Sequence, residues 1–220
     1  MDGQMALQVK ICGMTNRADA STAARCGADF VGLILAPGAR HVTLESARLI
    51  MGALPPTVQP VLLFRAAPLD EVVAALQATG CGWVQLHGRE PVAYLAQLVK
   101  RRPRLRLIKA WEVDSPTAGD DLLAYLHEAA RADVSVDVVL LDAPKGGPHP
   151  GYERLGDISH RLRNRPPAVW CAGRLTAANL ATAVASGRYD GVDVARGVES
   201  SPGVKDPAVV QRFIEIVKHL

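Results

Sequence analysis

Short apolar runs alternate with longer amphipathic stretches along almost the whole chain. The runs are too short for helices and predict buried strands, whereas Leu69, Val72, Val73 and Leu76 show the spacing of one helix face. Strands are expected at residues 7–11, 30–35, 61–64, 83–86, 105–109, 138–141, 169–171 and 192–194. Helices are expected at residues 17–26, 44–53, 69–78, 91–100, 120–131, 152–164, 177–185 and 207–219.

Eight strand–helix pairs in strict alternation predict an α/β fold of one kind, a single (β/α)₈ TIM barrel. The competing architecture is an open, doubly wound sheet. Because no long Ser-, Pro- or Gly-rich linker divides the chain, we expect one domain over residues 1–220. Most prolines fall between elements, and none interrupts a predicted strand.

The composition fits this fold and limits the partners. Hydrophobic residues make up 49% of the chain and aromatic residues 5%, which suits Ala-, Val- and Leu-rich helices on a parallel sheet. A net charge of +3 is compatible with a small anionic ligand but does not predict nucleic-acid binding. The basic run at residues 100–106 lies between a helix and a strand entry, where a solvated loop is expected.

The four cysteines carry no metal-site pattern. Cys12, Cys26, Cys81 and Cys171 lie far apart, without Cys-x-x-Cys or Cys/His spacing, so no metal is expected. The first residues lack a signal-peptide pattern, and the apolar runs are too short to cross a bilayer. We therefore expect a cytoplasmic protein with reduced thiols and no membrane partner.

In a barrel, the residues just after each strand meet at one rim, which holds the active site. Cys12 ends the first strand and precedes Gly13, so its thiol is a candidate base. The alternative is a buried small hydrophobic residue. The other rim residues are residues 37–41, His87, Asp142, Gly173, Arg174, Ala195, Arg196 and Gly197. Thr15 is expected to cap the helix that begins near Arg17.

Asp142 follows four apolar residues, so its carboxyl would emerge beside apolar walls that favour the protonated form required of a general acid. A helix cap or an ion pair with Lys145 are the alternatives. Gln85 and His87 alternate along one strand, so both should face the barrel interior. His87 is either a substrate-orienting or a structural histidine, and Arg40 is either a carboxylate ligand or a surface arginine.

The turns after the seventh and eighth strands contain Gly173-Arg174 and Ala195-Arg196-Gly197. Barrels frequently bind phosphate here through backbone N–H groups. The loop from Lys145 to Gly151 is rich in Gly and Pro, as in a lid or a plain surface loop.

Several of these segments together resemble one family, the phosphoribosylanthranilate isomerases of tryptophan biosynthesis. They are Lys10-Ile11-Cys12-Gly13-Met14-Thr15, Gln85-Leu86-His87-Gly88-Arg89-Glu90, Leu140-Leu141-Asp142, Ala172-Gly173, Gly191-Val192-Asp193-Val194, Gly197-Val198-Glu199 and Gly203-Val204-Lys205-Asp206. The resemblance spans nearly the whole chain in the right order. It implies a (β/α)₈ barrel, an Amadori rearrangement of an N-phosphoribosyl arylamine, and no metal or organic cofactor.

Residue by residue, the resemblance implies that Asp142 protonates the furanose ring oxygen and that Cys12 removes the C2′ proton. Arg40 matches the arginine that faces the anthranilate carboxylate. Lys10, Gln85 and His87 are expected to contact the substrate. We expect a phosphorylated small molecule as ligand, no nucleic acid, and a monomer or homodimer.

The chain departs from the family pattern at the phosphate turns, where Arg174 replaces a glycine and Ala195-Arg196 replaces two serines. The two arginines either supplement phosphate binding or select another anion. Two alternatives therefore stay open: a diverged barrel acting on another phosphoribosyl or sugar amine, and a non-catalytic ligand-binding barrel.

Overall fold

The computed structural model describes residues 6–144, 147–162 and 166–220. Eight parallel strands form its centre: β1 (Gln8–Cys12), β2 (Phe30–Ile34), β3 (Gln59–Phe64), β4 (Trp83–Leu86), β5 (Arg106–Glu112), β6 (Val138–Asp142), β7 (Ala168–Cys171) and β8 (Gly191–Val194). The helices are α1 (Arg17–Cys26), α2 (Leu44–Met51), α3 (Leu69–Thr79), α4 (Val92–Arg101), α5 (Ala118–Arg131), α6 (Tyr152–Arg161), α7 (Leu180–Ala185) and α8 (Pro207–Lys218).

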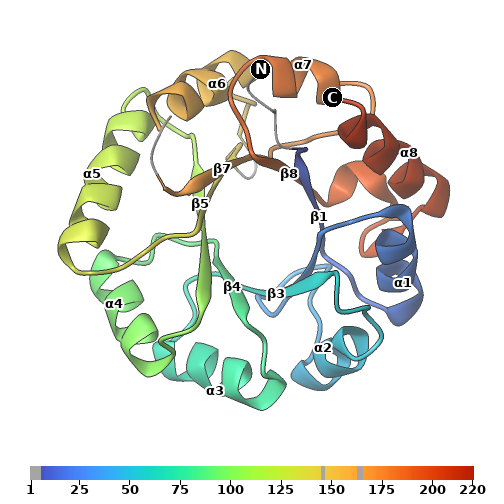
Figure 1. The fold of residues 1–220 in the computed structure, drawn as a ribbon, viewed down its shortest axis with the longest axis horizontal. Coiled ribbons are helices and arrows are strands. Elements are labelled where there is room, and N and C mark those ends of the chain that lie inside the picture. The colour runs from blue at the N-terminus through green and yellow to red at the C-terminus, as the bar shows by residue number, and fades with distance from the viewer. Residues whose placement is uncertain (1–5, 145–146, 163–165) are drawn as a thin grey trace.

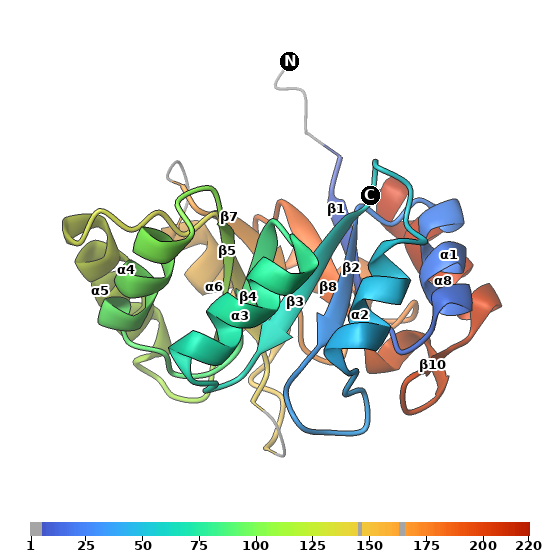
Figure 2. The same cartoon turned by 90° about the horizontal axis from the view of Figure 1, so that it is seen from below.

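The strands pair in chain order, and β8 pairs with β1 to close the barrel. The helices form a ring around the strands (Figure 1). Closure excludes the open doubly wound sheet and confirms the predicted (β/α)₈ barrel. Figure 2 shows the strands running towards the rim at the lower edge of that view, where the loops after the strands gather.

Side chains alternate between two cores. The larger core lies between the strands and the helices, and a smaller cluster fills the barrel interior around Phe30, Val61, Ile108, Leu140 and Trp170. Because successive strand residues point to opposite faces, every second residue of each strand points into the barrel interior. The side chains at the rim therefore lie directly above a packed layer of interior side chains.

The glycines that follow α1 and α3 end those helices in the left-handed conformation, with φ of 97° at Gly27 and 69° at Gly80. The prediction that Gly80 ends its helix is thus confirmed. The prediction that Thr15 caps α1 is wrong, because Asn16 Oδ1 accepts the Asp19 N–H and the Thr15 hydroxyl donates to Gly203 O instead.

Three strand features differ from the prediction. Pro60 is the second residue of β3, so one strand does contain a proline, placed near its start where a missing N–H is tolerated. β5 continues to Glu112, which pairs in register with Asp142 of β6. A short hairpin, β9 (Glu199–Ser201) and β10 (Val204–Lys205), follows the 3₁₀ turn η1 (Arg196–Val198) and was not predicted.

Four helices are shorter than predicted: α2 by two residues, α8 by one, and α6 and α7 by three each. α6 ends at Arg161, and the rest of the predicted segment includes residues 163–165, outside the described residues. α7 begins at Leu180, because Asn179 Oδ1 accepts the Thr176 N–H in a preceding turn.

No helix among the described residues is long and apolar enough to span a membrane. In the basic run, Arg101 pairs with Asp70 and Arg106 with Asp137, all near the surface.

Candidate active site

Cys12 is the last residue of β1, and its thiol is 4% exposed. Lys10 lies two residues earlier on the same face of the strand. Gly32 is the β2 partner of Cys12, and a Cβ built on it would lie 2.7 Å from Cys12 Sγ and 3.0 Å from Lys10 Nζ. The absence of a side chain at Gly32 therefore makes room for the thiol and the ammonium group together.

Lys10 is fully buried, and its Nζ lies 2.9 Å from Asp193 Oδ1 on the neighbouring strand β8. Burial opposes the charge of Lys10, but Asp193 and Cys12 outweigh it, so the pKa of Lys10 is raised. Burial also raises the pKa of the Cys12 thiol, and the ammonium of Lys10 is the largest influence in the opposite direction.

Asp142 ends β6 with its side chain 18% exposed, and His87 Nε2 lies 3.3 Å from its Oδ2. The Gln85 side-chain nitrogen lies 2.9 Å from His87 Nδ1. With the amide NH₂ of Gln85 facing Nδ1, that ring nitrogen is the acceptor, and Nε2 lies on the Asp142 side without a hydrogen bond among the described residues. Gln85 and His87 therefore share one face, as predicted, and His87 lies beside the carboxyl of Asp142.

The alternatives for Asp142 fare differently. It does not cap α6, whose N-cap is Gly151. The alternative pairing with Lys145 lies outside the described residues.

Arg40, in the loop between β2 and α2, forms a bidentate ion pair with Glu199: Nε lies 2.7 Å from Oε1 and Nη2 lies 2.5 Å from Oε2. Its aliphatic part covers Gly13, where a Cβ would lie 2.6 Å from Arg40 Cδ. Arg40 thus lies over the turn that follows Cys12. Within the described part of the chain its Nη1 makes no hydrogen bond, which leaves one nitrogen for a substrate carboxylate.

Lys205 of β10 contacts both the turn that follows Cys12 and the Glu199 carboxylate. Its Nζ lies 2.7 Å from Cys12 O, 3.0 Å from Ala195 O and 2.8 Å from Glu199 Oε1. These contacts link the turns after β1 and β8 to Glu199, the carboxylate that pairs with Arg40. Sequence reasoning assigned no role to Glu199 or Lys205, because the hairpin that carries Lys205 was not predicted.

The two predicted phosphate turns are in direct contact. A Cβ on Gly197 would lie 1.8 Å from Leu175 O, so only glycine allows this approach. Gly173 has φ of 91°, and a Cβ there would lie 2.8 Å from Ala143 N. The glycines thus bring three rim turns together, the arrangement in which backbone N–H groups can face an anion.

The two unexpected arginines lie at these turns with exposed side chains. Arg174 adopts φ of 55°, and its Nη2 donates to Gly147 O. Arg196 is the first residue of η1, directly after Ala195. Neither side chain is buried, so both are placed where a cation can approach a bound anion from the solvent side.

The loop after β6 lies on the turn after β7. His149 Nε2 lies 3.2 Å from Gly173 O, and the Tyr152 hydroxyl donates to the same oxygen at 2.9 Å. The rings of His149 and Tyr152 pack with centroids 4.5 Å apart. These contacts were not predicted, because nothing local in the sequence pairs a loop with the next turn. Residues 145–146 of this loop lie outside the described residues.

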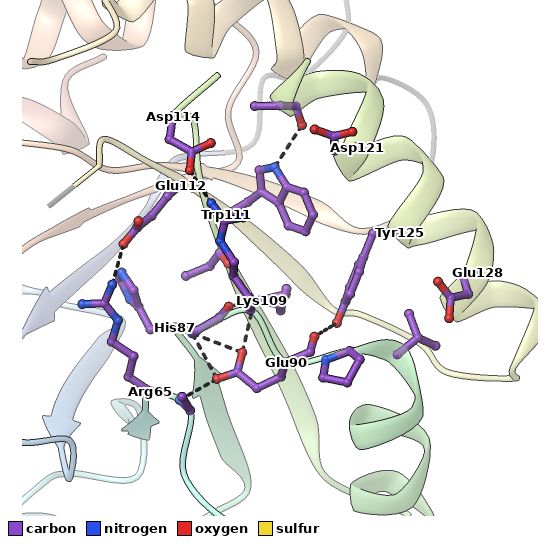
Figure 3. Close-up of a pocket in the computed structure, with 17 residues that line it drawn as sticks. Arg65, His87, Glu90, Lys109, Trp111, Glu112, Asp114, Asp121, Tyr125 and Glu128 are labelled. Atoms are coloured by element: carbon purple, nitrogen blue, oxygen red, sulfur yellow. Dashed lines mark hydrogen bonds and ion pairs between the residues drawn. The ribbon is translucent and has the colours of Figure 1, made fainter. Parts of the chain in front are cut away.

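A side pocket of about 610 Å³ opens beside this rim, between α5 and the turn after β4 (Figure 3). Its lining reaches His87 but includes neither Cys12 nor Asp142. Glu90 lies at its centre, with Oε2 3.2 Å from Lys109 Nζ, and the Tyr125 hydroxyl donates to Glu90 O at 3.0 Å (Figure 3). The buried charges of the pocket are therefore already paired.

A metal centre finds no support in the described residues, which contain no group of three or more His, Cys, Asp or Glu side chains able to hold an ion. The site instead places a thiol with a buried ammonium and a carboxyl with a histidine at one barrel rim. A closed (β/α)₈ barrel with this pair at the carboxyl ends of its strands defines a barrel enzyme of the acid–base class.

Comparison with known proteins gives the family. A model of the N-(5'-phosphoribosyl)anthranilate (PRA) isomerase family matches residues 9–216, and the chain belongs to this family. The N-(5'-phosphoribosyl)anthranilate isomerase of Deinococcus radiodurans is 37% identical over 96% of this chain and 97% of its own. That of Citrifermentans bemidjiense is 39% identical over 97% of this chain and 98% of its own.

Solved structures agree. Phosphoribosyl anthranilate isomerase from Thermotoga maritima superimposes with a TM-score of 0.83 at 30% identity, covering 97% of this chain and all of that one. A complex of phosphoribosyl anthranilate isomerase with reduced 1-(o-carboxyphenylamino)-1-deoxyribulose 5-phosphate gives a TM-score of 0.81 at 30% identity, with the same coverage of both chains. The resemblance predicted from the sequence motifs is thereby confirmed.

Proposed function

We propose that this protein isomerises N-(5'-phosphoribosyl)anthranilate to the 1-amino-1-deoxyketose phosphate. The observation that carries the proposal is the placement of a thiol and a carboxyl, Cys12 and Asp142, on strands β1 and β6 of one rim, in a chain of this family. In the closed barrel β7 and β8 separate β6 from β1, so an acid and a base can approach a substrate at the mouth from two directions.

In the first step Asp142 donates its proton to the ring oxygen. The C1′–O bond breaks, and the anthranilate nitrogen supplies the electron pair that forms the C1′=N iminium. His87 Nε2, 3.3 Å from Asp142 Oδ2 and unpaired in this state, can turn to donate to the carboxylate that remains. Gln85 fixes the histidine tautomer, and this contact gives both residues a role at the acid.

In the second step the Cys12 thiolate removes the C2′ proton. The C2′–H bond breaks, an S–H bond forms, and the C–H electron pair forms the C1′=C2′ bond while the C1′=N π pair returns to nitrogen, which gives an enolamine. Tautomerisation then yields the ketose. Positive charge on the iminium and at Lys10 favours this step, because both stabilise negative charge at the point of proton transfer.

The substrate is oriented at both of its ends, by Arg40 at the carboxylate and by the turns after β7 and β8 at the phosphate. Arg40, held by Glu199, offers Nη1 to the anthranilate carboxylate. Gly173 and Gly197 bring the phosphate turns together, and Arg174, Ala195 and Arg196 surround them. A phosphorylated small molecule is the ligand, and the protein acts as a monomer or homodimer in the cytoplasm.

A direct assay tests the proposal. Purified protein is mixed with freshly prepared phosphoribosylanthranilate, and the loss of substrate fluorescence is followed together with appearance of the ketose by chromatography. Catalysed conversion supports the proposal. Absence of conversion, with turnover of another phosphoribosyl amine, would assign the chain to the diverged alternative left open by Arg174 and Arg196.

A further inference from the structure

A charged pair is buried inside the barrel directly behind Cys12. Lys10 is 0% exposed and Asp193 9%, and the two residues are register partners on β1 and β8. Burying two charges costs desolvation that their mutual attraction repays only in part, and apolar replacements are often neutral or stabilising. Stability alone is therefore a weak reason for burying this pair, and its place beside Cys12 points to a chemical role.

The ammonium group of this pair lies close to the Cys12 thiol. A single point, the position of a Cβ on Gly32, lies 2.7 Å from Cys12 Sγ and 3.0 Å from Lys10 Nζ. Sulfur and nitrogen therefore share one hollow above that glycine. Asp193 Oδ1 lies 2.9 Å from the same Nζ.

We propose that Lys10 is a positioning residue that stabilises the thiolate form of Cys12 through its buried ammonium group, and that Asp193 keeps this group charged. The inference rests on the proposed function, in which Cys12 is the base, and deepens it. It assigns Lys10 to the base rather than to direct contact with substrate. The C2′ proton passes to sulfur, and Lys10 keeps its own protons throughout.

The other charges around Cys12 act differently. Lys205 Nζ binds the backbone oxygen of Cys12 rather than its sulfur, and Arg40 lies over Gly13. Both cations are bound to one carboxylate, Glu199. Lys10 lowers the pKa of the thiol most strongly, against burial, which raises it most, and against the Asp193 carboxylate, which raises it less than Lys10 lowers it. Lys10 is therefore the residue whose loss should matter most for thiolate formation.

Thiolate absorbance at 240 nm as a function of pH gives the test, and it needs no turnover. The titration of Cys12 is the difference between each protein and the same protein carrying Cys12→Ser. In Lys10→Met we expect this titration to move to higher pH by about one unit, which is about tenfold less thiolate at a given pH below the transition. Since Lys10→Met leaves Asp193 unpaired, the double variant Lys10→Met/Asp193→Asn removes both charges together.

A matched control is Lys109→Met/Glu90→Gln, which removes another buried ion pair, between Lys109 of β5 and Glu90. Its Cys12 titration should coincide with that of the wild type. The acid limb of kcat/KM for phosphoribosylanthranilate should move with the thiol titration in the Lys10 variants.

The outcomes separate the two claims. Unshifted Cys12 titrations in the folded Lys10 variants, or an equal shift in the Lys109/Glu90 control, would overturn the assignment of Lys10. A wild-type protein without isomerase turnover would end the proposed function. The titration would then decide by itself whether Lys10 stabilises the Cys12 thiolate.

Discussion

Arg40 and Glu199 form a bidentate ion pair between residues 159 positions apart in the chain. The pair connects the loop after β2 to the start of the β9–β10 hairpin, and Lys205 binds the same Glu199 carboxylate. An arginine expected to face a substrate carboxylate is therefore held in place by a carboxylate of the protein. This carboxylate also connects Arg40 to the backbone of Cys12 through Lys205.

Acid sensitivity should depend on Glu199. Burial tends to raise the pKa of this carboxyl, but the cations of Arg40 and Lys205 outweigh burial and lower it. A lowered folded-state pKa means stability that is present above the unfolded value, about 4.3, and is lost as the pH falls through the folded value. We expect urea unfolding midpoints between pH 7 and pH 3 to fall less steeply in Glu199→Gln than in the wild type.

The exposed Glu71, on the first turn of α3, provides the control for this experiment. Glu71→Gln should keep the wild-type dependence on pH. An identical slope in Glu199→Gln and the wild type would show that the carboxylate contributes no pH-dependent stability.

Contact between the phosphate turns should require Gly197. A methyl group at this position would lie 1.8 Å from Leu175 O, so the two turns must separate in Gly197→Ala. We expect a loss of about 1–3 kcal/mol in the free energy of unfolding, as for overpacked sites, and a higher KM for a phosphorylated substrate. Gly82→Ala is the matched control, because a Cβ there meets no atom within 4 Å. Equal stability of the two variants would contradict the proposed close contact.

Arg174 and Arg196 should assist phosphate binding from the solvent side. Replacing either by serine is expected to raise KM by about five- to tenfold, the effect of about 1 kcal/mol, with a smaller change in kcat. Steady-state kinetics at low and high salt checks this, since screening should weaken the contribution. A lower KM in either variant would instead mean that the arginine obstructs the pocket.

The Lys109–Glu90 ion pair that lines the side pocket should stabilise the fold only while it is intact. Lys109→Met leaves Glu90 buried without its cation, which should cost about 3–5 kcal/mol in urea unfolding. Lys109→Met/Glu90→Gln should recover much of that loss, whereas Lys100→Met, at an exposed position in α4, should change little. A double variant no more stable than the single one would contradict this interpretation.

The fold was predictable because its evidence is local. Hydrophobic periodicity located every strand and helix of the barrel, and the rule that the carboxyl ends of strands meet at one rim selected Cys12, His87 and Asp142. Errors occurred where polar or long-range contacts set the boundary, as at Glu112, which extends β5 by pairing with Asp142.

Local sequence patterns did not predict which side chains the site residues contact. Lys10 and Asp193 are 183 positions apart, and their contact depends on the register with which β8 closes onto β1. Thr15 likewise bonds Gly203 O across the chain rather than capping its own helix. Local patterns fix which face a side chain occupies, but they do not fix which side chain it meets across the barrel.

The paired roles of Cys12 and Asp142 are tested most directly by single-turnover conversion of phosphoribosylanthranilate in Cys12→Ser and Asp142→Asn. We expect each substitution to lower the rate by about 10²–10⁴-fold while substrate binding changes little, because a positioned proton donor or acceptor is removed. Wild-type rates in either variant would contradict these roles.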